Sequence, residues 1–152
     1  KNNLTTIGVH EIAHQWWYGA VGNDQTTEPW LDEALAFYSE LLYIEAYYPE
    51  SVSWWWKNRV DIYQPYGPVD ATIYSYERSE HFIPSMYGQA ARFIQQLRQT
   101  MGEEAFFAFL ADYYMSHRGQ SVTAKDFFEA VRRHYSGDLD PLLRDYFANV
   151  EW

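Results

Sequence analysis

The hydrophobic and polar positions along this chain repeat with the period of a helix over most of its length. One run, WLDEALAFYSELLYIEAYY, starts after Pro29, a favourable residue for a first helical turn, and stops at Pro49. The strict alternation that is typical of strands is weak everywhere. The pattern therefore predicts an all-α fold, with helices at about residues 3–21, 29–48, 50–64, 85–101, 103–117, 124–135 and from about 141 onward.

A different pattern occupies residues 65–84, PYGPVDATIYSYERSEHFIP. Its proline and glycine residues interrupt the helical period, so we expect a long irregular segment here. Segments of this kind in a compact domain often carry function. The tyrosines at positions 74 and 76 lie within it.

The first expected helix contains the sequence HEIAH at residues 10–14, an H-E-x-x-H motif. On a helical wheel His10 and His14 fall about 40° apart and one turn from each other, so two imidazoles can converge on one ion. Glu11 falls about 100° from His10, which is too far for an easy third ligand but close enough to touch a metal-bound water. The alternative is a pair of core histidines that bind backbone carbonyls.

A metal ion at this motif would need a further ligand. The chain has no cysteine, so only histidine and carboxylate ligands are possible, and a catalytic zinc takes three protein ligands plus a water. Glu33 shares its helical face with the apolar Trp30 and Phe37, where a carboxylate is costly unless it meets a cation. Eighteen residues separate it from His14, which is long enough for a helix end, a turn and a returning helix. A solvated helix carboxylate suits Asp32 better, because Asp32 lies on another side.

The residues HEIAHQWW, followed after eighteen positions by a glutamate within WLDEALAFYSE, resemble the M1 family of zinc metallopeptidases. These are gluzincin aminopeptidases with a thermolysin-like catalytic domain. The resemblance is dense over residues 7–45 and looser downstream. The family pattern commonly reads WLNEGFA-x-Y-x-E, and this chain departs from it at Asp32 and Ala34.

The resemblance implies a role for each motif position. It implies that His10, His14 and Glu33 bind one zinc ion and that Glu11 is the general base. Glu40 matches the last glutamate of the family pattern and would then hydrogen-bond a ligand histidine from the second shell. The alternative for Glu40 is an ordinary solvated glutamate.

The family also uses a tyrosine that stabilises the oxyanion, placed at the start of a helix well downstream. Tyr87 in SMYGQAARFIQQLRQTMGEEAFFAFL has this position, although Gly88-Gln89-Ala90 stands where the family has Glu-Lys-Gly. Tyr74 and Tyr76 are the alternatives for this role.

The fold implied by the resemblance is the multi-helical, C-terminal half of a thermolysin-like catalytic domain. We expect a single domain at 1–152, with the zinc helices at 3–48 and a helical remainder at 50–152. The family's Gly-x-Met-Glu-Asn stretch, whose glutamate binds the free amine of the substrate, does not occur in this chain. We therefore expect a missing N-terminal part of the same chain to supply it, and we expect the 152 residues alone to hydrolyse aminoacyl substrates poorly.

The composition of the chain limits the kinds of binding partner that are expected. The formal net charge of -10 argues against nucleic acid, because phosphates would be repelled. No apolar run approaches the roughly 18 residues of a transmembrane helix. Neither cytoplasm nor cell envelope is favoured.

The expected function is that of a zinc-dependent peptidase, an aminopeptidase with peptide substrates. The alternatives are a gluzincin endopeptidase, another zinc hydrolase, or a non-catalytic helical module with a structural zinc. Glu11 argues against the last, because a structural site needs no base.

Overall fold

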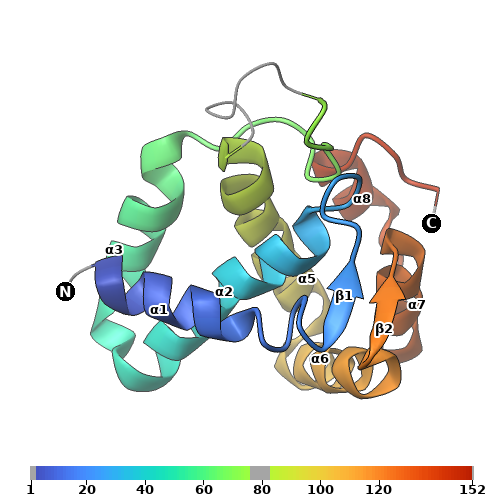
Figure 1. Cartoon of the computed structure of the whole chain (residues 1–152), viewed down its shortest axis with the longest axis horizontal. Coiled ribbons are helices and arrows are strands. Elements are labelled where there is room, and N and C mark those ends of the chain that lie inside the picture. Colours follow the sequence, from blue (N-terminus) through green and yellow to red (C-terminus); the bar gives the residue numbers. More distant parts are fainter. Residues whose placement is uncertain (1–2, 76–82, 152) are drawn as a thin grey trace.

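The computed structural model describes residues 3–75 and 83–151, and these form a mainly helical molecule (Figure 1). Apart from shorter helical turns, the helices are α1 (Asn3–Ala13), α2 (Trp30–Tyr47), α3 (Val52–Trp55), α5 (Ala90–Met101), α6 (Glu103–His117), α7 (Ala124–His134) and α8 (Asp140–Tyr146). None of the described helices is long and apolar enough to span a bilayer. The all-α prediction is confirmed.

Shorter helical turns extend two of these helices. The stretch Pro49–Tyr63 continues from a 3₁₀ turn through α3 into the π-helical Trp56–Val60 and a second 3₁₀ turn. A π-helical stretch, Pro84–Gln89, leads directly into α5. Both agree with the expected helices at 50–64 and 85–101. Gly102 separates α5 from α6 with a φ of 81°, a backbone conformation that glycine adopts without a steric penalty.

The first helix is shorter than the sequence predicts. It ends at Ala13, and the chain then turns through Tyr18, which has a φ of 110°. Gly19 is needed in this turn, because a Cβ at this position would lie 3.0 Å from the carbonyl oxygens of His14 and Gln15. The prediction of a helix up to residue 21 is therefore wrong.

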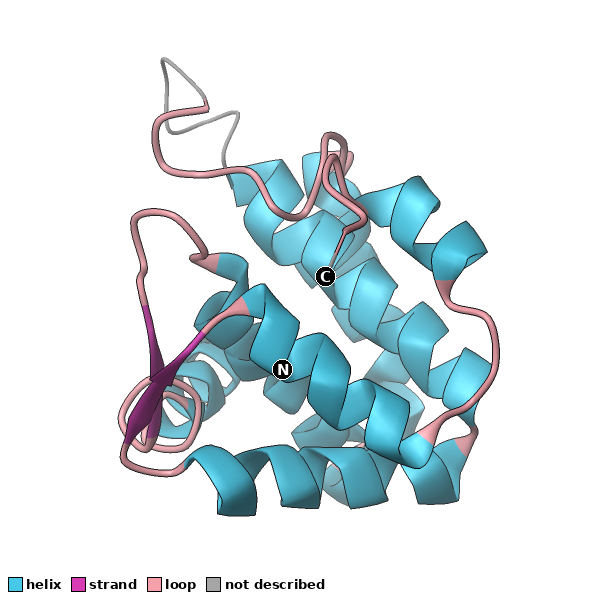
Figure 2. Cartoon of the chain, turned by 90° about the vertical axis from the view of Figure 1, so that its right-hand side faces the viewer, coloured by secondary structure: helices cyan, strands magenta, loops and turns pink. Residues whose placement is uncertain are grey.

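After this turn the chain forms strand β1 (Val21–Asn23), which pairs in parallel with β2 (Gln120–Val122). Figure 2 shows the two strands at one side of the helical body. These strands could not be predicted from the sequence, because three-residue strands carry almost no alternation and their pairing joins segments about a hundred residues apart.

Helix α2 is the central element of the fold and packs against both α1 and α5. Its first residue, Trp30, is completely buried and lies against Phe93, Phe127, Phe128 and Phe147, with ring centroids 5.1 to 6.0 Å apart. This aromatic cluster fixes the N-terminal end of α2. Because α2 also packs along α1, its first turn is held against the C-terminal end of α1.

Candidate metal centre

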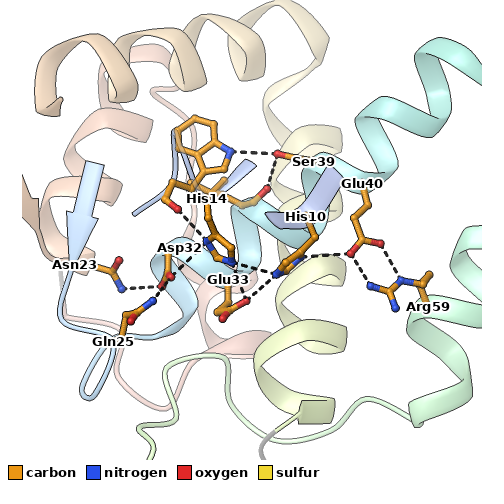
Figure 3. Close-up of polar contacts among 11 residues, drawn as sticks. His10, His14, Asn23, Gln25, Asp32, Glu33, Ser39, Glu40 and Arg59 are labelled. Atoms are coloured by element: carbon orange, nitrogen blue, oxygen red, sulfur yellow. Dashed lines mark hydrogen bonds and ion pairs between the residues drawn. The ribbon is translucent and has the colours of Figure 1, made fainter. Parts of the chain in front are cut away.

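The site lies where the C-terminal end of α1 meets the first turn of α2 (Figure 3). His10 is in the last turn of α1, and Glu33 is in the first turn of α2. His14 lies one residue beyond the end of α1, but its backbone N–H still donates to the His10 carbonyl at 3.2 Å. The two histidines therefore keep the one-turn relation that the motif predicts, although the helix itself is shorter.

Three side-chain atoms converge at this place. The Nε2 atoms of His10 and His14 are 3.1 Å apart, and Glu33 Oε2 is 3.2 Å from the first and 3.7 Å from the second. Ligands about 2.0–2.1 Å from a tetrahedral zinc lie about 3.3–3.4 Å from one another. The buried Glu33 Oε2 meets no donor in hydrogen-bonding geometry among the described residues. The three residues therefore fit the ligand set of one zinc ion.

The charges at this site favour a cation. Burial alone would lower the pKa of His10, but the carboxylates of Glu33 and Glu40 outweigh burial and raise it to about 9. Burial alone would raise the pKa of Glu33, whereas the two histidines beside it lower it to about 2. Both shifts reflect the attraction between the buried carboxylates and positive charge at the histidines, which either protons or a metal cation can supply.

Glu11 lies next to this group on α1, and its side chain is exposed. It is therefore accessible to water and to a substrate, as a general base must be. Its negative charge also contributes, after burial and the charges of Glu33 and Asp32, to the raised pKa of Tyr87.

Tyr87 lies in the π-helical stretch before α5. Its ring centroid is 5.9 Å from that of His10 and 5.5 Å from that of Phe37. Of the two alternatives, Tyr74 is 76% exposed on the irregular segment, and Tyr76 lies outside the described residues. The structure thus brings Tyr87 next to His10, one of the three converging residues.

Glu40 is completely buried, so it is not a solvated glutamate. Its Oε1 lies 3.3 Å from His10 Nδ1. Arg59 donates to both of its oxygens, at 2.6 and 2.8 Å, and the indole N–H of Trp55 donates at 2.9 Å. The sequence indicated Glu40 but not its partners, because these come from a helical segment whose orientation depends on tertiary packing.

Asp32 is a residue that the sequence analysis missed, and the expectation that it is solvated is wrong. Its side chain is only 1% exposed. Asn23 and Gln25 donate amide hydrogen bonds to its two oxygens at 2.9 and 2.7 Å. Its Oδ2 lies 3.7 Å from His14 Nδ1, the atom that also donates to the Trp17 carbonyl at 3.1 Å. The sequence signal was weak: two amide residues, one at the end of β1 and one in the loop that precedes α2.

Two clefts open beside the converging ligands, and Tyr87 lines both. The first has a volume of about 260 Å³, and the second of about 220 Å³. The first is lined by Gln25, Pro29, Asp32, Glu33, Ile73, Met86 and Tyr87, and the second by Phe37, Arg59, Tyr63, Ile83 and Tyr87. Tyr87 therefore borders two separate clefts beside this site.

Comparison with known proteins gives consistent matches. Residues 1–146 match the family model described as "Peptidase family M1 domain". The chain is 27% identical to Aminopeptidase M1 of Arabidopsis thaliana, covering 96% of this chain and 18% of that protein. It is 28% identical to Aminopeptidase N of Bos taurus, covering 99% of this chain and 17% of that protein. The chain thus spans about a sixth of the length of these curated relatives.

Solved structures resemble the fold as well as the sequence. An M1 zinc metallopeptidase from Deinococcus radiodurans matches with a TM-score of 0.70 and 28% identity, covering 91% of this chain and 32% of that one. A mutant of that metallopeptidase, bound to a Tyr-Ser-Ala substrate, matches equally well, with the same TM-score, identity and coverage.

Proposed function

The chain belongs to peptidase family M1, and from this premise we propose that it forms the zinc-binding helical part of an aminopeptidase. One observation carries the proposal: His10 Nε2, His14 Nε2 and Glu33 Oε2 converge within 3.1 to 3.7 Å of one another beside an exposed glutamate. The zinc ion, when bound, supplies Lewis-acid polarisation of the substrate carbonyl and lowers the pKa of a water molecule.

The chain's own residues supply the proton transfers and the charge stabilisation. Glu11 accepts a proton from the attacking water and passes it to the leaving amine. The hydroxyl of Tyr87 donates a hydrogen bond to the oxyanion that forms on the scissile carbonyl. Burial and the nearby carboxylates raise the pKa of Tyr87, so this hydroxyl keeps the proton that it must donate.

Glu40 acts as a positioning residue for His10. Its carboxylate lies 3.3 Å from Nδ1, the ring nitrogen of His10 that faces away from the converging atoms. Such a partner fixes the tautomer and the orientation of a ligand histidine. The bidentate pair with Arg59 balances the charge of Glu40 and holds it in place.

The relatives named aminopeptidases support exopeptidase activity. The residue that binds the free amine is expected in another part of the protein. An apolar surface for that part lies on α1 and just beyond its end, because Leu4 and Ile12 on the helix and Trp16 in the following turn are 47 to 73% exposed. We propose that the preceding part of the same protein covers these apolar side chains.

The substitution Tyr87→Phe tests the oxyanion role. It removes one hydrogen bond made to developing charge, so kcat should fall roughly 10²–10³-fold with zinc content unchanged. Steady-state kinetics on an aminoacyl amide measure this. The matched control is Tyr74→Phe, which should retain normal kcat. Equal losses in both variants, or no loss for Tyr87→Phe, would rule out the assignment.

Removal of the metal tests the proposed function as a whole. In the intact protein, dialysis against a chelator should abolish hydrolysis of an aminoacyl amide, and one equivalent of zinc should restore it. A peptide with an acetylated N-terminus should resist cleavage, because an aminopeptidase needs the free amine. Internal cleavage of the acetylated peptide would favour an endopeptidase, and full activity without metal would refute a zinc peptidase.

A further inference from the structure

We infer that Asp32 is a positioning residue for His14 and that its negative charge strengthens metal binding at this site. The inference rests on the proposed zinc site, and it concerns a position at which this chain departs from the usual family pattern. It starts from the burial of a carboxylate that was expected, from the helical pattern, to be solvated.

The contacts of Asp32 show how the carboxylate is held. Asn23 and Gln25 donate to different oxygens of Asp32, at 2.9 and 2.7 Å. The two amides fix the carboxylate plane and leave Oδ2 3.7 Å from His14 Nδ1 (Figure 3). Nδ1 is the nitrogen of His14 that does not face the converging atoms, and it donates to the Trp17 carbonyl. Asp32 therefore lies behind a ligand histidine, as Glu40 does behind His10.

Glu40 and Asp32 differ in the positive charge that compensates them. Glu40 is compensated by the guanidinium of Arg59. For Asp32, the hydrogen bonds found in the described part of the chain come from two neutral amides, and the ion-pair partner found there is His14. A carboxylate that is 1% exposed is costly to bury without a cation. Positive charge on the His14 side of the site therefore offsets the cost of burying Asp32.

In this arrangement, metal binding at His14 and the negative charge of Asp32 should stabilise each other. A zinc ion on His14 stabilises the Asp32 carboxylate, and the carboxylate in turn polarises the His14 ring and strengthens its bond to zinc. Without metal, the same buried charge should destabilise the fold. A residue with only a structural role would show no such opposition between metal affinity and stability.

The test is the substitution Asp32→Asn in the intact protein. Asparagine keeps the shape, and the exposed side chain of Gln25 can turn its amide to pair with the new NH₂ group. The zinc dissociation constant, measured by competition with a chromophoric chelator, should rise 10–100-fold. The melting temperature of the protein freed of metal should stay equal or increase. The expected result is therefore weaker zinc binding together with an equal or higher melting temperature of the metal-free protein.

Asp112→Asn is the matched control. Asp112 on α6 accepts hydrogen bonds from Arg133 and His134, both on α7, which makes it a paired carboxylate away from the site. This variant should lower the melting temperature and leave the zinc dissociation constant unchanged.

Four outcomes would decide against this inference or against the proposed function. Normal zinc affinity in Asp32→Asn, or a parallel loss of affinity and metal-free stability, overturns the inference. If Asp32→Asn does not fold, Gln25→Ala replaces it, since it removes one donor to Asp32 from an exposed position, and unchanged zinc affinity there overturns the inference as well. Full zinc binding by His14→Ala would instead overturn the proposed function, so the two failures are distinguishable.

Discussion

Replacing Glu11 by glutamine should leave one zinc ion bound and lower peptidase turnover by roughly 10²–10⁴-fold or more. The reason is positional: Glu11 is exposed on α1 beside the ligands but is not among the three converging groups. Glutamine preserves the size and polarity of the side chain and cannot accept the proton. The measurement is kcat on an aminoacyl amide together with the zinc content of the same sample.

The control for Glu11→Gln is Glu129→Gln on α7, which removes only an exposed contact with Lys125 at 3.8 Å. It should retain both zinc and turnover. A Glu11→Gln protein with normal turnover would contradict the role of general base. Loss of zinc in that variant would instead indicate that Glu11 helps to hold the metal.

The second large effect is the loss of zinc when one of the proposed metal ligands is removed. His10→Ala and Glu33→Ala should each lose zinc during purification, because each removes one of three converging donors. The loss in affinity should exceed the 10–100-fold that is typical when a residue that only hydrogen-bonds a metal ligand is removed. Metal analysis by atomic absorption, with turnover measured alongside, checks this expectation.

His117→Ala is the matched histidine control. The Nδ1–H of His117 donates to the Tyr113 carbonyl within α6, so its removal should leave the zinc content unchanged. Stoichiometric zinc in both His10→Ala and Glu33→Ala would refute the ligand assignment.

The sequence predicted the parts of the site that depend on local spacing. His10 and His14 are four residues apart, and a single helical turn is enough to bring their rings together. The length of the connection to Glu33 and the apolar face of its helix pointed to the third donor. Tyr87 was indicated by the family resemblance rather than by spacing, and its function stays a prediction.

The parts that the sequence could not predict depend on tertiary contacts. The end of α1 at Ala13 is set by a turn that feeds β1 into a parallel pair with β2, far along the chain. The burial of Asp32 requires that the end of β1 and the loop after it bring the amide side chains of Asn23 and Gln25 back over α2. A helical wheel treats Asp32 as a solvent-facing position because it contains no information about the loop that covers it.

The central claim is that His10, His14 and Glu33 hold a zinc ion that Glu11 uses for peptide hydrolysis. The most direct measurement determines zinc content and aminoacyl-amide turnover in parallel for the intact wild-type protein, Glu11→Gln and Glu33→Ala. The account predicts zinc and turnover in the wild-type protein, zinc without turnover in Glu11→Gln, and neither zinc nor turnover in Glu33→Ala. Turnover in a zinc-free sample, or full zinc and turnover in Glu33→Ala, would contradict it.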